Sequence, residues 1–186
     1  TLDRSSAASD VYKRQVAGTG TRVITVDDDI IYPEWLVEKL LVVGQYRFDT
    51  VVAYRAHRIE LRDGRIRPYA KWSKAISSSA SILHFATGVS GVLYPASFIS
   101  FVAAHGGDFA EHAPNADDVW LHLMELRSGH QVRQVFAQPR NFAVIPSTQL
   151  TSLVQHNLAG ANDTQIAATY TCLLYTSPSP RDRQKS

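Results

Sequence analysis

Three consecutive carboxylates, Asp27, Asp28 and Asp29, follow an apolar run in the segment VITVDDDIIYPEWL, residues 23–36. Adjacent like charges repel one another, so each must stay solvated or have a cation close by. Residues 22–26 are expected to form a buried strand, with the carboxylates at its carboxyl end. In an extended chain Asp27 and Asp29 would share one face, roughly 6–7 Å apart, with Asp28 opposite. The pattern predicts a cation site in a crevice at a strand end.

Oxygen ligands of this kind favour Mg²⁺ or Mn²⁺. Two other interpretations of the triplet are open. In the first, Asp29 helps to cap the following helix and its two neighbours are in solvent. An aspartyl-phosphate hydrolase also has an aspartate directly after a strand, but it needs a hydroxylated residue four positions after the first aspartate. Ile31 occupies that position, so the hydrolase is the weaker alternative.

A second acidic pair, Asp117 and Asp118, opens the helix-like segment ADDVWLHLMELRSG, which ends at Gly129. Acidic residues in a first helical turn complement the helix dipole, by about 0.3–1 kcal/mol, so this pair taken alone favours a structural role. Gly88 and Gly91 interrupt the strand-like segment 81–95. They either let the backbone approach a ligand closely or simply form a turn.

The remaining pattern consists of strands that alternate with helices, which predicts an α/β fold. A helix is expected after Pro33, ending near Gly44, and Asp63-Gly64 between two alternating runs predicts a tight hairpin. Further strands and a short helix are expected at DTVVAYRA, QVRQVF and SFISFVAA. Several polar residues have open roles. Arg55 and Arg58 either contact an anionic group or lie at a solvated strand end, which is the favoured interpretation. Asn162 and Asp163 either hydrogen-bond a substrate or belong to a loop turn, and His156 taken alone is structural or solvated.

Residues 1–15 and 172–186 are expected to be non-native. The segment DVYKRQ back-translates to GATGTGTATAAGAGACAG, and the complementary strand encodes CLLYT followed by the start of a serine codon, which is the sequence at 172–177. Complementary strands at opposite ends are typical of translated sequencing adapters, so both blocks are set aside. The alternative is a natural disordered tail at each end. What remains, residues 16–171, is expected to be an internal piece of a longer domain.

The end blocks hold six of the 19 basic residues and three of the 17 acidic ones, so residues 16–171 carry a formal charge of −1. Bulk charge therefore gives no indication of nucleic acid binding. The single cysteine, Cys172, lies in an end block, which leaves no disulfide framework. The seven histidines include no pair four residues apart and no cysteine partner, which argues against zinc. No apolar run is long enough to span a membrane.

Three segments, VDDDIIYPEWL, ATGVSGVLYP and NADDVWLHL, together resemble motifs of GT-A fold glycosyltransferases, particularly family-two-like enzymes. The resemblance implies a partial GT-A, Rossmann-like mixed sheet flanked by helices, with the N-terminal nucleotide-binding part missing. It implies a metal site at Asp27, Asp28 and Asp29, completed by His156. Two departures matter: the later acidic motif is Asp-Asp instead of Glu-Asp, and the missing part leaves the donor undefined.

The resemblance also assigns roles. Asp27, Asp28, Gly88 and Gly91 would contact the nucleotide-sugar, while Asp118, or else Asp117, would act as catalytic base. The implied function is transfer of a sugar from a nucleotide-sugar to a hydroxyl acceptor with Mn²⁺ or Mg²⁺, in bacterial polysaccharide or glycoconjugate synthesis. The implied location is the cytoplasm or the periphery of the inner membrane. The alternatives are a non-catalytic sugar-binding domain on the same fold and a related nucleotidyltransferase.

Overall fold

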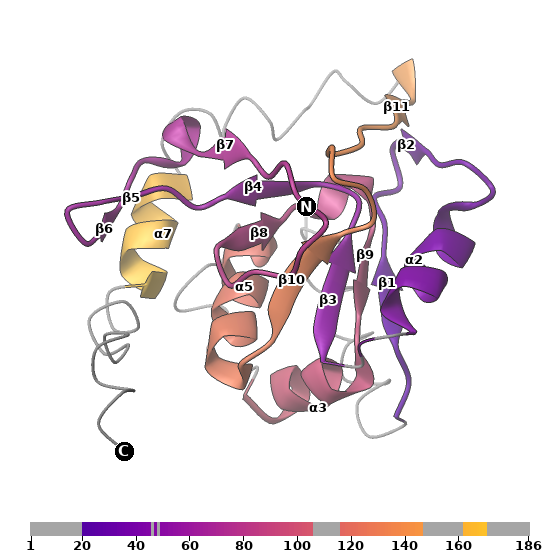
Figure 1. Cartoon of the computed structure of the whole chain (residues 1–186), viewed down its shortest axis with the longest axis horizontal. Coiled ribbons are helices and arrows are strands. Elements are labelled where there is room, and N and C mark those ends of the chain that lie inside the picture. Colours follow the sequence, from indigo (N-terminus) through magenta and orange to yellow (C-terminus); the bar gives the residue numbers. More distant parts are fainter. Residues whose placement is uncertain (1–19, 46, 48, 106–115, 147–161, 171–186) are drawn as a thin grey trace, which may run out of the picture.

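The structure, a computed structural model, describes residues 20–45, 47, 49–105, 116–146 and 162–170 (Figure 1). These residues form a mixed α/β fold with four α-helices and several small open sheets. The two end blocks and His156 lie outside the described residues. None of the described helices is both long and apolar enough to cross a membrane.

The main sheet has four strands in the order β1-β9-β3-β10. β9 is antiparallel to both of its neighbours, whereas β10 runs parallel to β3, so the sheet is mixed, as the sequence predicts. These strands are β1 (Val23–Thr25), β3 (Thr50–Ala53), β9 (Val92–Tyr94) and β10 (Gln131–Gln134).

Helices cover both faces of this sheet. Because side chains alternate along a strand, Val51 and Ala53 of β3 belong to a core with α3 and α5, while Val52 and Tyr54 belong to a second core with α2. The helices are α2 (Leu36–Gly44), α3 (Ala96–His105), α5 (Asp117–Ser128) and α7 (Asn162–Tyr170).

Two strand-like segments are divided between sheets: the sequence predicts the bend at the glycines of segment 81–95 but not the one within DTVVAYRA. The chain bends at Tyr54 and Arg55, and the segment 81–95 bends at the 3₁₀ turn η2 (Gly88–Ser90). Backbone hydrogen bonds join the two bends, from Thr87 N–H to the Arg55 carbonyl at 3.1 Å and from Tyr54 N–H to the Gly91 carbonyl at 3.3 Å. The bends therefore lie side by side at one end of the main sheet.

Beyond the bends the chain forms a second, three-stranded sheet of β4 (Ala56–Arg58), β7 (Ser73–Lys74) and β8 (His84–Ala86), in the order β7-β4-β8. The hairpin of β5 (Leu61–Arg62) and β6 (Arg65–Ile66) extends from it toward the periphery of the molecule (Figure 1). Its turn confirms the sequence prediction, since Asp63 and Gly64 both have positive φ, 53° and 73°, as a type I′ turn requires.

Helix α5 also ends where the sequence predicts, because Gly129 takes a left-handed conformation with φ 75° and its N–H caps the helix. Two features are absent from the sequence prediction. A short antiparallel pair joins β2 (Ile30–Ile31) to β11 (Ala143–Val144). Residues 162–170, where the sequence analysis expected no helix, form helix α7, whose Ile166 and Tyr170 are buried in the core shared with α5.

Candidate functional site: two acidic segments at one end of the sheet

The first acidic segment is not the extended strand end that the sequence predicts. Asp28 and Asp29 lie in a turn between β1 and β2, and β2 pairs with β11 in a separate sheet. The Ile145 N–H donates to the Asp29 carbonyl at 2.8 Å across this pairing. Asp28 is exposed and Asp29 half-buried. The predicted alternation of the three carboxylates between two faces is therefore wrong.

Asp27 is positioned by a tyrosine that the sequence analysis did not single out. The Asp27 N–H donates to the Tyr32 hydroxyl at 2.9 Å, and that hydroxyl donates to the Val89 carbonyl, also at 2.9 Å. The Tyr32 ring is held edge-on by Phe142, with ring centres 5.6 Å apart. Tyr32 thus ties the acidic segment after β1 to η2.

The second acidic segment meets η2 from the other side. The Gly88 N–H donates to the Asp118 carboxylate, at 3.1 Å to Oδ1 and 3.3 Å to Oδ2. A Cβ atom added to Gly88 would lie 3.3 Å from Asp118 Oδ1 and 4.0 Å from Asp27 Oδ1. Asp117 is exposed at the start of α5, and its carboxylate accepts the Asp118 N–H at 3.0 Å. Gly88 therefore lies between the carboxylates of Asp27 and Asp118.

Proximity of these carboxylates changes their acidity. Burial raises the pKa of Asp27, and repulsion from Asp29, Asp117 and Asp28 raises it further. The pKa of Asp118 is raised well above its usual range by burial first and then by Asp117 and Asp27, while the Gly88 N–H and the Arg55 charge act in the opposite direction. The negative charges of Asp27 and Asp118 are thus disfavoured by the neighbouring carboxylates, and a bound cation would relieve this repulsion.

Within the described ranges, no basic nitrogen lies within 4.0 Å of a carboxylate oxygen of Asp27 or Asp118. The cation that acts on Asp118 electrostatically is Arg55, which lies half-buried in the bend between β3 and β4 and not at a solvated strand end as predicted. Arg58, at the end of β4, is exposed as predicted.

Arg55 is held by two neutral groups. Its guanidinium donates to Thr87 Oγ1 at 2.9 Å and contacts His57 Nε2 at 3.1 Å. A guanidinium has only donors, so Nε2 accepts and the neutral ring carries its proton on Nδ1. Burial, and then the charge of Arg55, lowers the pKa of His57 to about 4. Neither partner neutralises Arg55, which leaves its charge free to act on anions at this end of the sheet.

The donor set fits Mg²⁺ or Mn²⁺ in kind, because every candidate ligand is a carboxylate oxygen. In the part of the chain that the structure describes, no group of three or more His, Cys, Asp or Glu side chains is arranged to hold one ion. Mg²⁺ commonly binds through one or two carboxylates, with water and substrate phosphate filling its other positions. Asp27 with Asp117 or Asp118 is the set that could hold such an ion, and His156 lies outside the described residues.

Asp163, which the sequence offers as a substrate contact or a turn residue, forms a hydrogen bond within the fold. Its carboxylate accepts the Tyr69 N–H at 2.6 Å from the first turn of α7. The Tyr69 ring is close enough to Asp118 for that carboxylate to raise the pKa of its hydroxyl, after burial. Asp163 therefore positions the turn that carries Tyr69 toward the acidic residues.

An aromatic cluster beside the site was not predicted either. Trp35, which is 40% exposed, has ring contacts with Tyr54, Phe136 and Phe142, at centre distances of 5.9, 6.4 and 6.0 Å. Phe142 also contacts Tyr32, so the cluster adjoins the Asp27 anchor. The residues come from three distant segments, which is why no local pattern indicates the cluster.

Two hollows on the described surface, of about 630 and 320 Å³, are lined by other residues and not by Asp27, Asp117 or Asp118. Comparison of the chain with family models, with curated proteins and with solved structures gives no match. A functional assignment must therefore rest on the geometry and charge of the site itself.

Proposed function

We propose that the chain is part of a metal-dependent glycosyltransferase of the GT-A type, which moves a sugar from a nucleotide-sugar to a hydroxyl acceptor. One observation carries the proposal: Asp27, after the first strand, and Asp118, at the start of α5, converge on Gly88. The three segments that resemble the family's motifs are distant in sequence, and each contributes one of these residues. Their convergence is what a shared substrate site requires.

Departure of a nucleoside diphosphate leaves negative charge, which Mg²⁺ or Mn²⁺ held by Asp27 and its acidic neighbours would neutralise as a Lewis acid. The other steps belong to the chain's own residues. Gly88 presents no side chain between the two carboxylates, which leaves room for a sugar to approach the backbone. Its N–H fixes the orientation of the Asp118 carboxylate.

Asp118 is proposed as the base that accepts the proton of the acceptor hydroxyl. A base is most effective when its pKa is near the working pH, and proton transfer of this kind contributes about 10²–10⁴-fold. Burial and the neighbouring carboxylates raise the pKa of Asp118 in the required direction. Asp117 is exposed and holds the Asp118 N–H, so it is the second choice.

The test is Mn²⁺ binding to the whole chain, followed by the electron paramagnetic resonance signal of free Mn²⁺. No nucleotide is added, because the nucleotide-binding part is expected to be missing and a nucleoside diphosphate binds Mn²⁺ by itself. Asp27→Asn and Asp118→Asn should each weaken binding about tenfold or more, as expected for loss of about 1.4 kcal/mol. Asp63→Asn, in the exposed hairpin turn, is the matched control and should bind as the unmodified chain does.

Equal Mn²⁺ affinity of the unmodified chain and the Asp27→Asn variant would refute the proposed cation site. Transfer itself is tested in the protein encoded by the intact parent reading frame, by release of nucleoside diphosphate from nucleotide-sugars. Asp118→Asn should abolish release while nucleotide binding persists. A non-catalytic sugar-binding domain would show no release in either form, and a nucleotidyltransferase would release pyrophosphate from a nucleoside triphosphate.

A further inference from the structure

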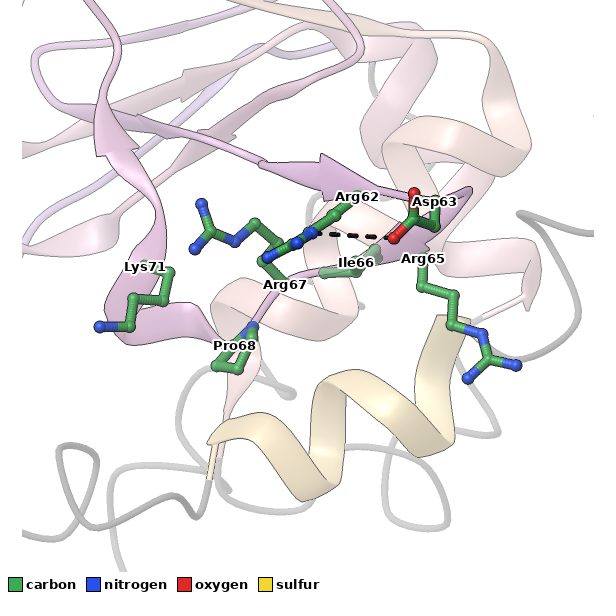
Figure 2. A pocket seen from close by; sticks show the side chains of 7 residues that line it. All are labelled: Arg62, Asp63, Arg65, Ile66, Arg67, Pro68 and Lys71. Carbon is green, nitrogen blue, oxygen red and sulfur yellow. Dashed lines mark ion pairs between the residues drawn. The ribbon is translucent and has the colours of Figure 1, made fainter.

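The hairpin β5–β6 and the turn that follows it carry a group of cations, Arg62, Arg65, Arg67 and Lys71, here called the basic hairpin. With Asp63, Ile66 and Pro68 these residues line a hollow of about 630 Å³ (Figure 2). Figure 2 shows the Arg62, Arg67 and Lys71 side chains extending to one side of the hairpin and the Arg65 side chain to the other. Positively charged side chains therefore extend from both sides of the hairpin.

This arrangement is unfavourable for the isolated hairpin. Arg62 and Arg65 are directly opposite each other in the strand register, and like charges at such positions destabilise a hairpin. Asp63 lies 3.7 Å from Arg62, but the two side chains are 78% and 90% exposed, so their attraction is weak. The carboxylate of the other neighbouring acid, Glu60, accepts from the Ser73 hydroxyl at 2.8 Å. In the described residues no acid lies within 4.0 Å of Arg65, Arg67 or Lys71. The charges of Arg65, Arg67 and Lys71 are therefore available to an anionic partner.

The chemistry around the cations favours a lipid surface over nucleic acid. Leu61, opposite Ile66 in the hairpin, is 44% exposed, and the alternation of side chains places this pair on the other face from Arg62 and Arg65. A hairpin that combines cations with an exposed apolar side chain suits the interface of an anionic bilayer. Binding of single-stranded nucleic acid commonly uses aromatic stacking, and none of the residues that line the hollow is aromatic.

We propose that the basic hairpin docks the protein peripherally on an anionic phospholipid surface. Residues 16–171 have a formal charge of −1, so the attraction is local to the hairpin and does not arise from overall charge. Each Lys or Arg near such a surface contributes about fivefold to partitioning, so three of them amount to on the order of 100-fold. The inference is independent of the transferase proposal, because it uses none of the acidic residues.

The test is flotation of the whole chain with vesicles of phosphatidylcholine alone or mixed with phosphatidylglycerol. Binding is expected only to the mixed vesicles and should fall as salt is added. The variant Arg62→Gln, Arg65→Gln, Lys71→Gln changes three exposed cations and should lower partitioning by on the order of 100-fold. Leu61→Ser should lower it less and leave the salt dependence unchanged.

The matched control is Arg181→Gln, Arg183→Gln, Lys185→Gln, which makes the same charge change in the C-terminal end block. It should retain most of the binding. Equal losses in the two triple variants would show that the end block or overall charge is responsible, and undiminished binding of the hairpin variant would do the same; either result overturns the proposal. Loss of RNA binding in the hairpin variant, with no vesicle binding by the unmodified chain, would assign the surface to nucleic acid instead. Circular dichroism checks that each variant folds.

Discussion

The Gly88 N–H and the Asp118 carboxylate, 30 residues apart in sequence, form a hydrogen bond shared between both carboxylate oxygens at 3.1 and 3.3 Å. This bond joins η2 to the first turn of α5. Tyr32 joins η2 to the Asp27 segment on the other side. The acidic group is therefore held by three backbone segments, and a change at Gly88 should affect the carboxylates more than the fold.

Cation binding at the acidic group should depend on pH. Because the pKa values of Asp27 and Asp118 are raised, these carboxyls keep their protons to a higher pH than ordinary aspartates, and a metal ion must displace those protons. Mn²⁺ affinity is therefore expected to increase with pH above the usual titration range of aspartate, with release of protons. Titrations at several pH values, followed by electron paramagnetic resonance, measure this. Affinity that stays constant over the range would contradict the expectation.

Gly88→Ala should weaken cation binding with little effect on stability. The new Cβ would lie 3.3 Å from Asp118 Oδ1, which is closer than most such contacts, so the carboxylate must move by a few tenths of an ångström. A shift of that size at a metal ligand is expected to lower Mn²⁺ affinity several-fold, whereas one methyl group at this position should change the free energy of unfolding by less than about 1 kcal/mol. Mn²⁺ titration and urea denaturation of the same variant separate the two effects.

Gly91→Ala should give the opposite result. Gly91 has φ 92° and ψ 133°, a conformation that residues with a side chain rarely adopt. A Cβ there would meet Leu36 Cδ1 at 3.5 Å, an ordinary contact, so the penalty comes from the backbone. We expect a loss of about 1–3 kcal/mol in the free energy of unfolding. The folded variant should bind Mn²⁺ normally; weaker binding at unchanged stability would instead favour the role beside the donor predicted for Gly91.

The contrast between these two glycines illustrates what sequence could provide. Local patterns predicted α2, the Asp63-Gly64 hairpin and the end of α5 at Gly129, because each depends on residues adjacent in sequence. The position of Gly88 between two carboxylates depends on contacts from both sides of the chain, and only the resemblance to known motifs placed those segments near one another.

Other features had no local signal. The bond from Tyr32 to the Val89 carbonyl spans 57 residues, and the contact of Arg55 with Thr87 spans 32. Helix α7 lies after a polar stretch, and its stability depends on burying Ile166 and Tyr170 beside α5. The bend at Tyr54 and Arg55 is likewise set by pairing with distant strands, whereas Gly88 and Gly91 indicated the other bend locally. Periodicity describes one segment at a time and cannot contain this information.

His122 should make the protein less stable in acid. It is 2% exposed, with its ring between the Tyr170 hydroxyl and the Ile82 carbonyl, and burial lowers its pKa to about 4. Between pH 6.5 and about 4 the unfolded chain binds a proton that the native state does not, so stability falls as pH falls. The full effect is on the order of 3 kcal/mol.

Urea denaturation over this pH range measures the effect. The free energy of unfolding of the unmodified chain should fall relative to that of His122→Gln as pH is lowered from 6.5 to about 4, even if His122→Gln is less stable throughout. His105→Gln, at an exposed position on α3, is the control and should keep the slope of the unmodified chain. Equal slopes for His122→Gln and the unmodified chain would exclude this origin of acid sensitivity.

Glu125 should have the opposite dependence on pH. It lies on α5, is 2% exposed, and its Oε2 has no hydrogen-bond partner among the described residues. Burial, and then repulsion from Asp118, raises its pKa well above the usual range. Above the pKa of the unfolded chain the native state retains a proton that the unfolded state has released, so stability falls as pH rises, by up to about 1.4 kcal/mol per pH unit.

Glu125→Gln removes this ionisation while preserving size. The variant should match the unmodified chain near pH 4, where the carboxyl is neutral in both native and unfolded states, and should become the more stable of the two as pH increases toward 8. Glu38→Gln, exposed on α2, makes the same chemical change and should leave the profile unchanged. Denaturation profiles for Glu125→Gln that run parallel to those of the unmodified chain would show that Glu125 ionises as easily in the folded protein as in the unfolded one. His122 and Glu125 act in opposite directions over the same range, because Glu125 lowers stability above pH 4.5 and His122 raises it up to pH 6.5. The two effects should offset each other in the unmodified chain, so each single variant should reveal the slope that the other residue causes.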